Sequence, residues 1–315
     1  MIQRRIALLA LPLLAIAGCA EGGGRWGGSG PPAPTALSFA TTLEGAEMAV
    51  DNAIARMDGF ERMAAREDAA VAFASPNRGR AAQRFNPAPA GAAEAAGRVL
   101  TPAFTAIGDY GHVLSQAASG ERLSPKSSAA GADRAREAAN GLDAVQAASG
   151  TPVAAPIRMA GLAGLAALAD LPEQLAQRGR SVTLAAMVAE AQPHLAATSA
   201  LLRAVIGPEP GQGTRGAIRA RRQGLDAGQA RFLEAVRADG RIGAGERYSI
   251  FRSVAEMRDN DPAQGNFSAM IALLSAMEEA HDALGTESPD AAGKVAAFEA
   301  AVARLGAANE ASRRG

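Results

Sequence analysis

Apolar residues recur at alternating spacings of three and four along much of this chain, which places them on one face of a helix. The spacing predicts one helix from about 36 to 74, ended by Ser75-Pro76-Asn77, and another from 184 that ends at Gly207-Pro208. The two apolar stripes are Leu43, Ala46, Val50, Ala53, Met57, Phe60 and Ala64, and Leu184, Val188, Ala191, Leu195, Thr198, Leu202 and Val205.

Further helical segments are separated by Gly, Pro, Ser or Asn clusters, and no stretch alternates with the period of a strand. Alanine, the strongest helix former, supplies about a quarter of the residues. The sequence therefore predicts an all-α, multi-helix bundle of long amphipathic helices over 36–310, and a division into two sub-bundles near residue 150 stays open. The further predicted helices are 89–118, 125–147, 154–177, 214–238, 244–258, 264–284 and 289–308.

Three features within the predicted helices need a separate interpretation. Pro102 and Pro193 fall inside helical patterns, where we expect them to kink the helix or begin a new turn. Segment 153–171 has few charges, but Arg158 and Asp170 interrupt it and most of its residues are small. We therefore predict a tightly packed central helix there, because small side chains let neighbouring backbones approach closely.

Composition excludes several classes of function. The 315 residues contain 32 basic and 32 acidic side chains, so the basic excess that nucleic-acid binding relies on is lacking. A single cysteine excludes an internal disulfide framework and a cysteine-rich metal site.

The N-terminus has the pattern of an export signal. Arg4 and Arg5 precede an apolar run, Ile6 to Ala17, that is too short to span a membrane. The run ends in Ile16-Ala17-Gly18-Cys19, which resembles the lipobox of bacterial lipoproteins, and Cys19 is the only cysteine of the chain. The alternative is an ordinary apolar helix with a buried thiol.

The resemblance implies that residues 1–18 are a signal peptide, cleaved between Gly18 and Cys19, and that Cys19 carries a diacylglycerol and a further acyl chain such as palmitate. Ala20, in place of an aspartate, favours the outer membrane, with the protein on its periplasmic face. Residues 19–35 are rich in glycine and proline and are predicted to form a flexible tether.

Each of the three histidines has an acidic residue about one helical turn before it. The Glu278-x-x-His281 spacing resembles half of a ferritin-like di-iron site, so Glu278 and His281 are candidate metal ligands. The second half is at best the shorter Asp109-x-x-His112, and ordinary helix contacts are the competing interpretation. The pairs are Asp109 with His112, Glu190 with His194, and Glu278 with His281.

Arginines concentrate in one part of the chain. Residues 203–258 contain eleven arginines and six acidic residues, whereas 259–290 contain seven acidic residues and no basic one. Arg215, Arg219 and Arg222 share a helical face and are a candidate patch for anionic headgroups, lipopolysaccharide phosphates or an acidic partner. The competing interpretation is neutralisation by the acidic segment that follows.

No nucleophile elbow or lysine-bearing phosphate loop occurs in the sequence, so neither an enzyme nor a cofactor is predicted. The leading hypothesis is a lipid-anchored, periplasm-facing scaffold or accessory subunit of a cell-envelope assembly. Its partners would be the membrane, through the N-terminal lipid, and an envelope protein. The alternative is a periplasmic protein that binds a small apolar molecule, lipid or metal between its helices.

Overall fold

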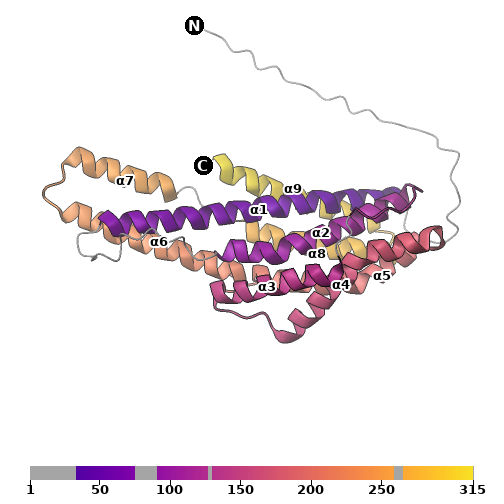
Figure 1. Cartoon of the computed structure of the whole chain (residues 1–315). Coiled ribbons are helices and arrows are strands. Elements are labelled where there is room, and N and C mark those ends of the chain that lie inside the picture. Colours follow the sequence, from indigo (N-terminus) through magenta and orange to yellow (C-terminus); the bar gives the residue numbers. More distant parts are fainter. Residues whose placement is uncertain (1–32, 75–90, 127–129, 259–264, 315) are drawn as a thin grey trace, which may run out of the picture.

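The computed structural model describes residues 33–74, 91–126, 130–258 and 265–314, and this part of the chain contains nine α-helices and no strand (Figure 1). The predicted all-α bundle is therefore confirmed. A short 3-10 turn, η2, covers Gly179–Ser181. The helices are α1 (Ala33–Ala74), α2 (Ala92–Ala118), α3 (Gly131–Ser149), α4 (Ala155–Arg178), α5 (Leu184–Ile206), α6 (Gly213–Ala238), α7 (Ala244–Arg258), α8 (Asn266–Gly285) and α9 (Ala291–Arg314).

Helix α1 sets the length of the bundle. Its 42 residues extend for about 63 Å at 1.5 Å per residue. Phe39, near its start, packs against α8 and α9, whereas Glu67 and Asp68, near its end, contact α6. Figure 1 accordingly shows α6 beside the C-terminal end of α1, away from Ala33.

Both predicted apolar stripes face the interior. Every residue of the α1 stripe is buried, and so is the α5 stripe except for Leu184, which is partly exposed. All of them except Ala64 and Thr198 belong to, or pack against, one apolar cluster that draws on helices before and after residue 150. The described residues therefore share one core on both sides of residue 150.

Several predicted boundaries differ from those of the structure; α9, for example, ends at Arg314 rather than at 308. Residues 33–35, predicted as tether, form the first turn of α1, where Pro34 removes no helical hydrogen bond. The helix predicted from 125 begins at Gly131, because the preceding loop takes other partners. Within that loop the Ser124 amide donates to Gln116, and Lys126 pairs with Glu44.

Pro102 and Pro193 lie inside α2 and α5, and both helices continue through them without interruption. Pro102 is buried within the main core, while Pro193 is exposed. The predicted start of a new turn is therefore not observed at either proline.

The low-charge segment 153–171 packs closely on α5 through the glycines of α4, as predicted. The prediction of a central helix is wrong, because the first turns of α4 lie at the surface, where Met159 is 68% exposed. A Cβ added at Gly164 would lie 2.9 Å from both the Cβ of Ala197 and the carbonyl oxygen of His194 on α5. One added at Gly161 would overlap the Cβ of Leu201. No helix among the described residues is long and apolar enough to cross a membrane.

Candidate functional site

Asp109, Glu190 and Glu278 are the carboxylates that precede the histidines by about one turn. Each binds an arginine of another helix and not the neighbouring histidine. Glu278 holds Arg203 through two hydrogen bonds of 3.0 and 2.6 Å. Both oxygens of Glu190 accept from the single Nη2 atom of Arg178, at 2.9 and 2.8 Å. Asp109 receives the Arg134 guanidinium at 2.8 Å in a pair that is almost fully buried. The arginines thus occupy the oxygens that a metal ion would need.

His281, the other candidate metal ligand, lies fully inside the core (0% exposed). Its Nε2 is 3.0 Å from the hydroxyl of Tyr110 on α2, and its Nδ1 contacts the side-chain oxygen of Gln192 on α5. A carbonyl oxygen only accepts, so Nδ1 carries the proton and Nε2 accepts from the Tyr110 hydroxyl. The rings of Phe39 and Tyr110 pack against the imidazole, with centroid-to-centroid distances of 5.6 and 5.7 Å.

Burial fixes the protonation of this pair. Removal from water lowers the pKa of His281 to about 3 and raises the pKa of Tyr110 well above its ordinary value. Both groups are therefore neutral at physiological pH. Across the ranges 33–74, 91–126, 130–258 and 265–314, no three His, Cys, Asp or Glu side chains form a group that could hold a metal ion. The candidate pair Glu278 and His281 is thus not brought together with further ligands.

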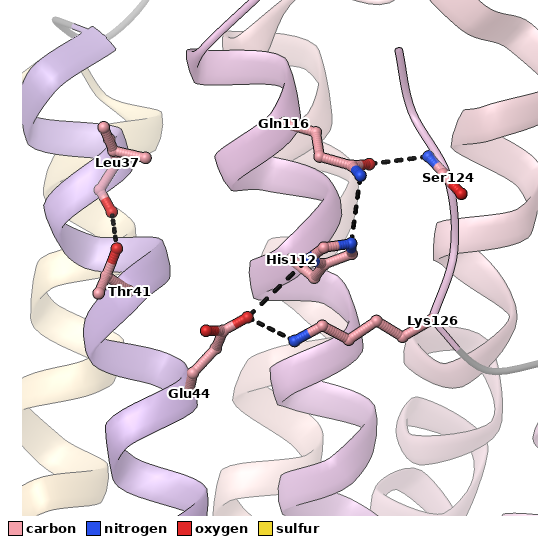
Figure 2. A network of polar contacts seen from close by, with 7 residues as sticks. All are labelled: Leu37, Thr41, Glu44, His112, Gln116, Ser124 and Lys126. Atoms are coloured by element: carbon pink, nitrogen blue, oxygen red, sulfur yellow. Dashed lines mark hydrogen bonds and ion pairs between the residues drawn. The ribbon is translucent and has the colours of Figure 1, made fainter. Parts of the chain in front are cut away.

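His112 belongs to a separate, partly exposed network that joins α1, α2 and the loop after α2 (Figure 2). Glu44 accepts from Lys126 at 2.5 Å and lies 3.8 Å from His112 Nδ1. The Gln116 oxygen accepts from the Ser124 amide at 2.7 Å, so its NH₂ group donates to His112 Nε2 at 3.1 Å. The network fastens the loop to the bundle and leaves no acidic pair for acid–base chemistry.

The candidate anion patch on α6 is only partly free. Arg222 is 18% exposed and pairs with Asp226 at 3.3 Å, and Arg215 donates to Ser268 at 3.4 Å. Arg219 is exposed, and the structure shows no ion pair for it among the described residues. The neighbouring Arg221 binds Asp68 of α1 at 3.3 Å. Asp68 and Asp226 thus neutralise part of the positive charge of α6.

We call helices α6 and α7 with the turn between them, residues 213–258, the α6–α7 arm. From Leu225 onward its buried apolar side chains, Leu225, Val236 and Val254, lie outside the main core. The buried amide of Gln229 links the arm to α1, because its NH₂ group donates to Glu67 at 3.2 Å. The arm therefore extends beyond the main core and contacts α1 there.

Two aromatic side chains of α7 face solvent in this arm. Tyr248 is 66% exposed and Phe251 is 59% exposed, at positions three apart on the helix. A groove of about 380 Å³ lies between α6 and α7 beside Phe251. Its other lining residues are Ala230, Leu233, Glu234, Val236, Arg237 and Arg247.

A larger groove of about 750 Å³ lies at the N-terminus of α2. Its charged side chains are already in use: Glu61 accepts from the amides of Ala92 and Ala93 at 3.0 and 2.8 Å, and Asp58 pairs with Arg62 at 2.7 Å. Alanine supplies most of the remaining lining. This groove is therefore not the apolar interior cavity that a lipid-binding bundle needs.

In comparisons with known proteins, no family model, no curated protein and no solved structure matches the chain. Cys19, Gly18 and most of the predicted tether lie outside the described residues.

Sequence reasoning missed the α6–α7 groove and the Tyr110–His281–Gln192 network. The groove had one usable signal, since Tyr248 and Phe251 stand in a segment with few other apolar residues. The network had none, because its members are far apart in the sequence and each has an ordinary helical neighbourhood.

Proposed function

We propose that this protein is a lipid-anchored helical scaffold or accessory subunit of a cell-envelope assembly, without enzymatic activity of its own. The anchor would be Cys19, on the periplasmic face of the outer membrane. The observation that carries the proposal is the α6–α7 arm, which exposes two aromatic side chains and several arginines. Figure 1 shows this arm at the end of the bundle opposite the start of α1. Exposed aromatic and arginine side chains are the types enriched in protein interfaces.

The geometry of the bundle fits this role. Glu67, which contacts the arm, lies 34 residues beyond Ala33, or about 51 Å along α1. A lipid on Cys19 would hold the chain by the end at which α1 begins. The arm could then reach a partner at a distance from the membrane surface.

The electrostatics of the remaining bundle support an assembly role over catalysis. Asp109, Glu190 and Glu278 are held by arginines, and His281 is neutral inside the core. A general acid or base needs to be free to exchange a proton with a substrate, whereas these carboxylates are held by arginines and the imidazole is buried.

The anchor is tested by mass spectrometry of the protein purified from a bacterial envelope, with a Cys19→Ser variant as control. We expect an N-terminal peptide that begins at acylated Cys19, and an intact signal peptide in the variant. An unmodified thiol with residues 1–18 still attached would overturn the anchored location.

The scaffold role is tested by affinity purification of the mature protein from detergent-solubilised envelopes, quantified against the Cys19→Ser variant. We expect at least one envelope protein at a reproducible ratio to the bait. No reproducible partner across detergents would contradict the role.

A further inference from the structure

We propose that the α6–α7 arm binds an acidic, amphipathic helix of a protein partner, whose apolar anchor side chains enter the groove between α6 and α7. This inference deepens the proposed function, since it specifies the surface and the chemistry of the partner that a scaffold would hold.

The groove provides the apolar part of the surface. Leu233, Val236 and Phe251 line it, and Phe251 remains more than half exposed. Its volume of about 380 Å³ is at the lower end for ligand pockets. Apolar side chains spaced three or four apart on a helix are suited to such a groove.

One face of α6 extends the groove toward the body of the bundle. Arg219 and Arg237 are 18 residues apart, which is a whole number of turns at 100° per residue. Ala230 and Leu233 lie within about 40° of the same direction. The face therefore presents an arginine at each end over about 27 Å. Between them it carries Gln223 and Asp226, which pairs with Arg222, and then Ala230 and Leu233 beside the groove.

Charge selects the partner. Residues 213–258 contain ten arginines and five acidic residues. Asp226, Asp239 and Glu256 are paired with arginines of the arm, and the two other acidic residues, Glu234 at the groove and Glu246, are exposed. Arg219, Arg231 and Arg237 are exposed with no ion pair to any described residue, so positive charge is in excess on this surface. Guanidinium groups bind carboxylates in two-pronged geometry, so an acidic helix complements this face.

Shape distinguishes a partner helix from a membrane surface. A helix that lies on a membrane presents a convex apolar stripe to the lipid. Here the apolar side chains line a concavity between two helices, with Arg237 and Arg247 among them. A segment with protruding side chains fills such a concavity better than a flat lipid surface does.

The test uses the full-length protein in living cells, with a photo-crosslinking amino acid in place of Ala230, which is exposed and lines the groove. The matched control carries the same amino acid in place of the exposed Ala303 on α9. Crosslinked peptides are sequenced by mass spectrometry. We expect a protein segment with net negative charge and apolar residues at helical spacing, obtained from position 230 and not from 303.

Variants added to the Ala230 probe test the two parts of the surface. Phe251→Ala and the pair Arg219→Glu with Arg237→Glu should each lower the crosslink yield about tenfold, which corresponds to about 1.4 kcal/mol of binding free energy. Met159→Ala and Arg304→Glu make the same kinds of change at exposed sites on other helices and should leave the yield unchanged. Far-UV circular dichroism checks that each variant is folded.

The other results of the crosslinking experiment would contradict the inference alone or together with the scaffold role. A crosslink from 230 to a basic or uncharged segment, or only to lipid, would overturn this inference and leave the proposed function standing. Protein crosslinks from 303 alone would have the same meaning, because the partner would then bind elsewhere. No protein crosslink from either site would contradict both this inference and the scaffold role.

Discussion

The hydroxyl of Tyr110 and the Nε2 atom of His281 form a hydrogen bond of 3.0 Å inside the bundle, although 171 residues separate them in the sequence. Gln192 holds the other ring nitrogen, so α2, α5 and α8 meet at one polar point within an apolar core. A buried network of this kind specifies how helices align, because any shift leaves polar groups unpaired.

Replacement of Tyr110 by phenylalanine should destabilise the protein. The variant keeps the ring but leaves His281 Nε2 buried without a donor, which costs about 1–3 kcal/mol. Tyr248→Phe is the matched control, because its hydroxyl is on an exposed side chain and its effect should stay within about 0.5 kcal/mol. Urea unfolding followed by circular dichroism measures both changes. Equal effects of the two variants would show that the buried hydrogen bond adds no stability.

The lowered pKa of His281 predicts a pH-dependent stability. The folded-state pKa is about 3 and the ordinary value is 6.5, so between these values the unfolded chain binds the extra proton. The free energy of unfolding therefore falls as the pH drops from about 6.5 toward 3, by as much as about 1.4 kcal/mol per pH unit. Above pH 7 the histidine no longer makes the free energy of unfolding depend on pH.

Comparison with His281→Gln isolates the contribution of the histidine. The partly buried Glu47 and the buried Asp109 have raised pKa values, so they change the free energy of unfolding with pH in the opposite direction, and they do so in both proteins. Unfolding free energies of the two proteins should converge as the pH falls toward 4. Tyr110→Phe keeps the imidazole buried and should retain the wild-type slope. Parallel curves for wild type and His281→Gln would contradict a neutral, buried His281.

The sequence predicted the helices well because most of their ends are local events. Gly207-Pro208 ends α5 whatever packs around it, since proline cannot continue the hydrogen-bond ladder. The start of α3 could not be predicted in this way. Lys126 pairs with Glu44, 82 residues away, and the amide of Gly131 is capped by Asp170 of α4. Such long-range partners are not visible in local periodicity.

The candidate metal pair shows a second limit of sequence reasoning. Residues three apart on a helix differ in direction by about 60°. In α8 that angle is enough to point His281 into the core while Glu278 reaches Arg203 on α5. The spacing thus predicted that the two side chains are neighbours, but the surrounding helices decide which partner each one takes.

The buried pair of Asp109 and Arg134 gives a further prediction. Asp109→Asn removes the counter-charge from a guanidinium that is 8% exposed, and we expect a loss of about 3 kcal/mol. Glu256→Gln breaks a pair of similar length on the surface, with side chains 66% and 63% exposed, and should cost less than about 0.5 kcal/mol. Chemical denaturation of each variant and of the wild type measures the two losses of unfolding free energy.

The double variant Asp109→Leu with Arg134→Met separates two causes of that loss. It removes both charges and keeps apolar volume, so much of the stability lost in Asp109→Asn should return. If the double variant is as unstable as the single one, packing around Asp109 rather than an unpaired charge causes the loss.

The close approach of α4 and α5 depends on glycine at two positions of α4. In Gly161→Ala the new methyl group would overlap the Cβ of Leu201, so the helices must separate, at a cost of about 1–3 kcal/mol. At Gly224 on α6 a methyl group would have no neighbouring atom within 4 Å, so Gly224→Ala should instead stabilise the protein by about 0.4–1 kcal/mol. Thermal unfolding should therefore show shifts of opposite sign. A stabilising Gly161→Ala would mean that α4 and α5 lie farther apart than described, because the intrinsic helix preference of alanine is the same at both sites.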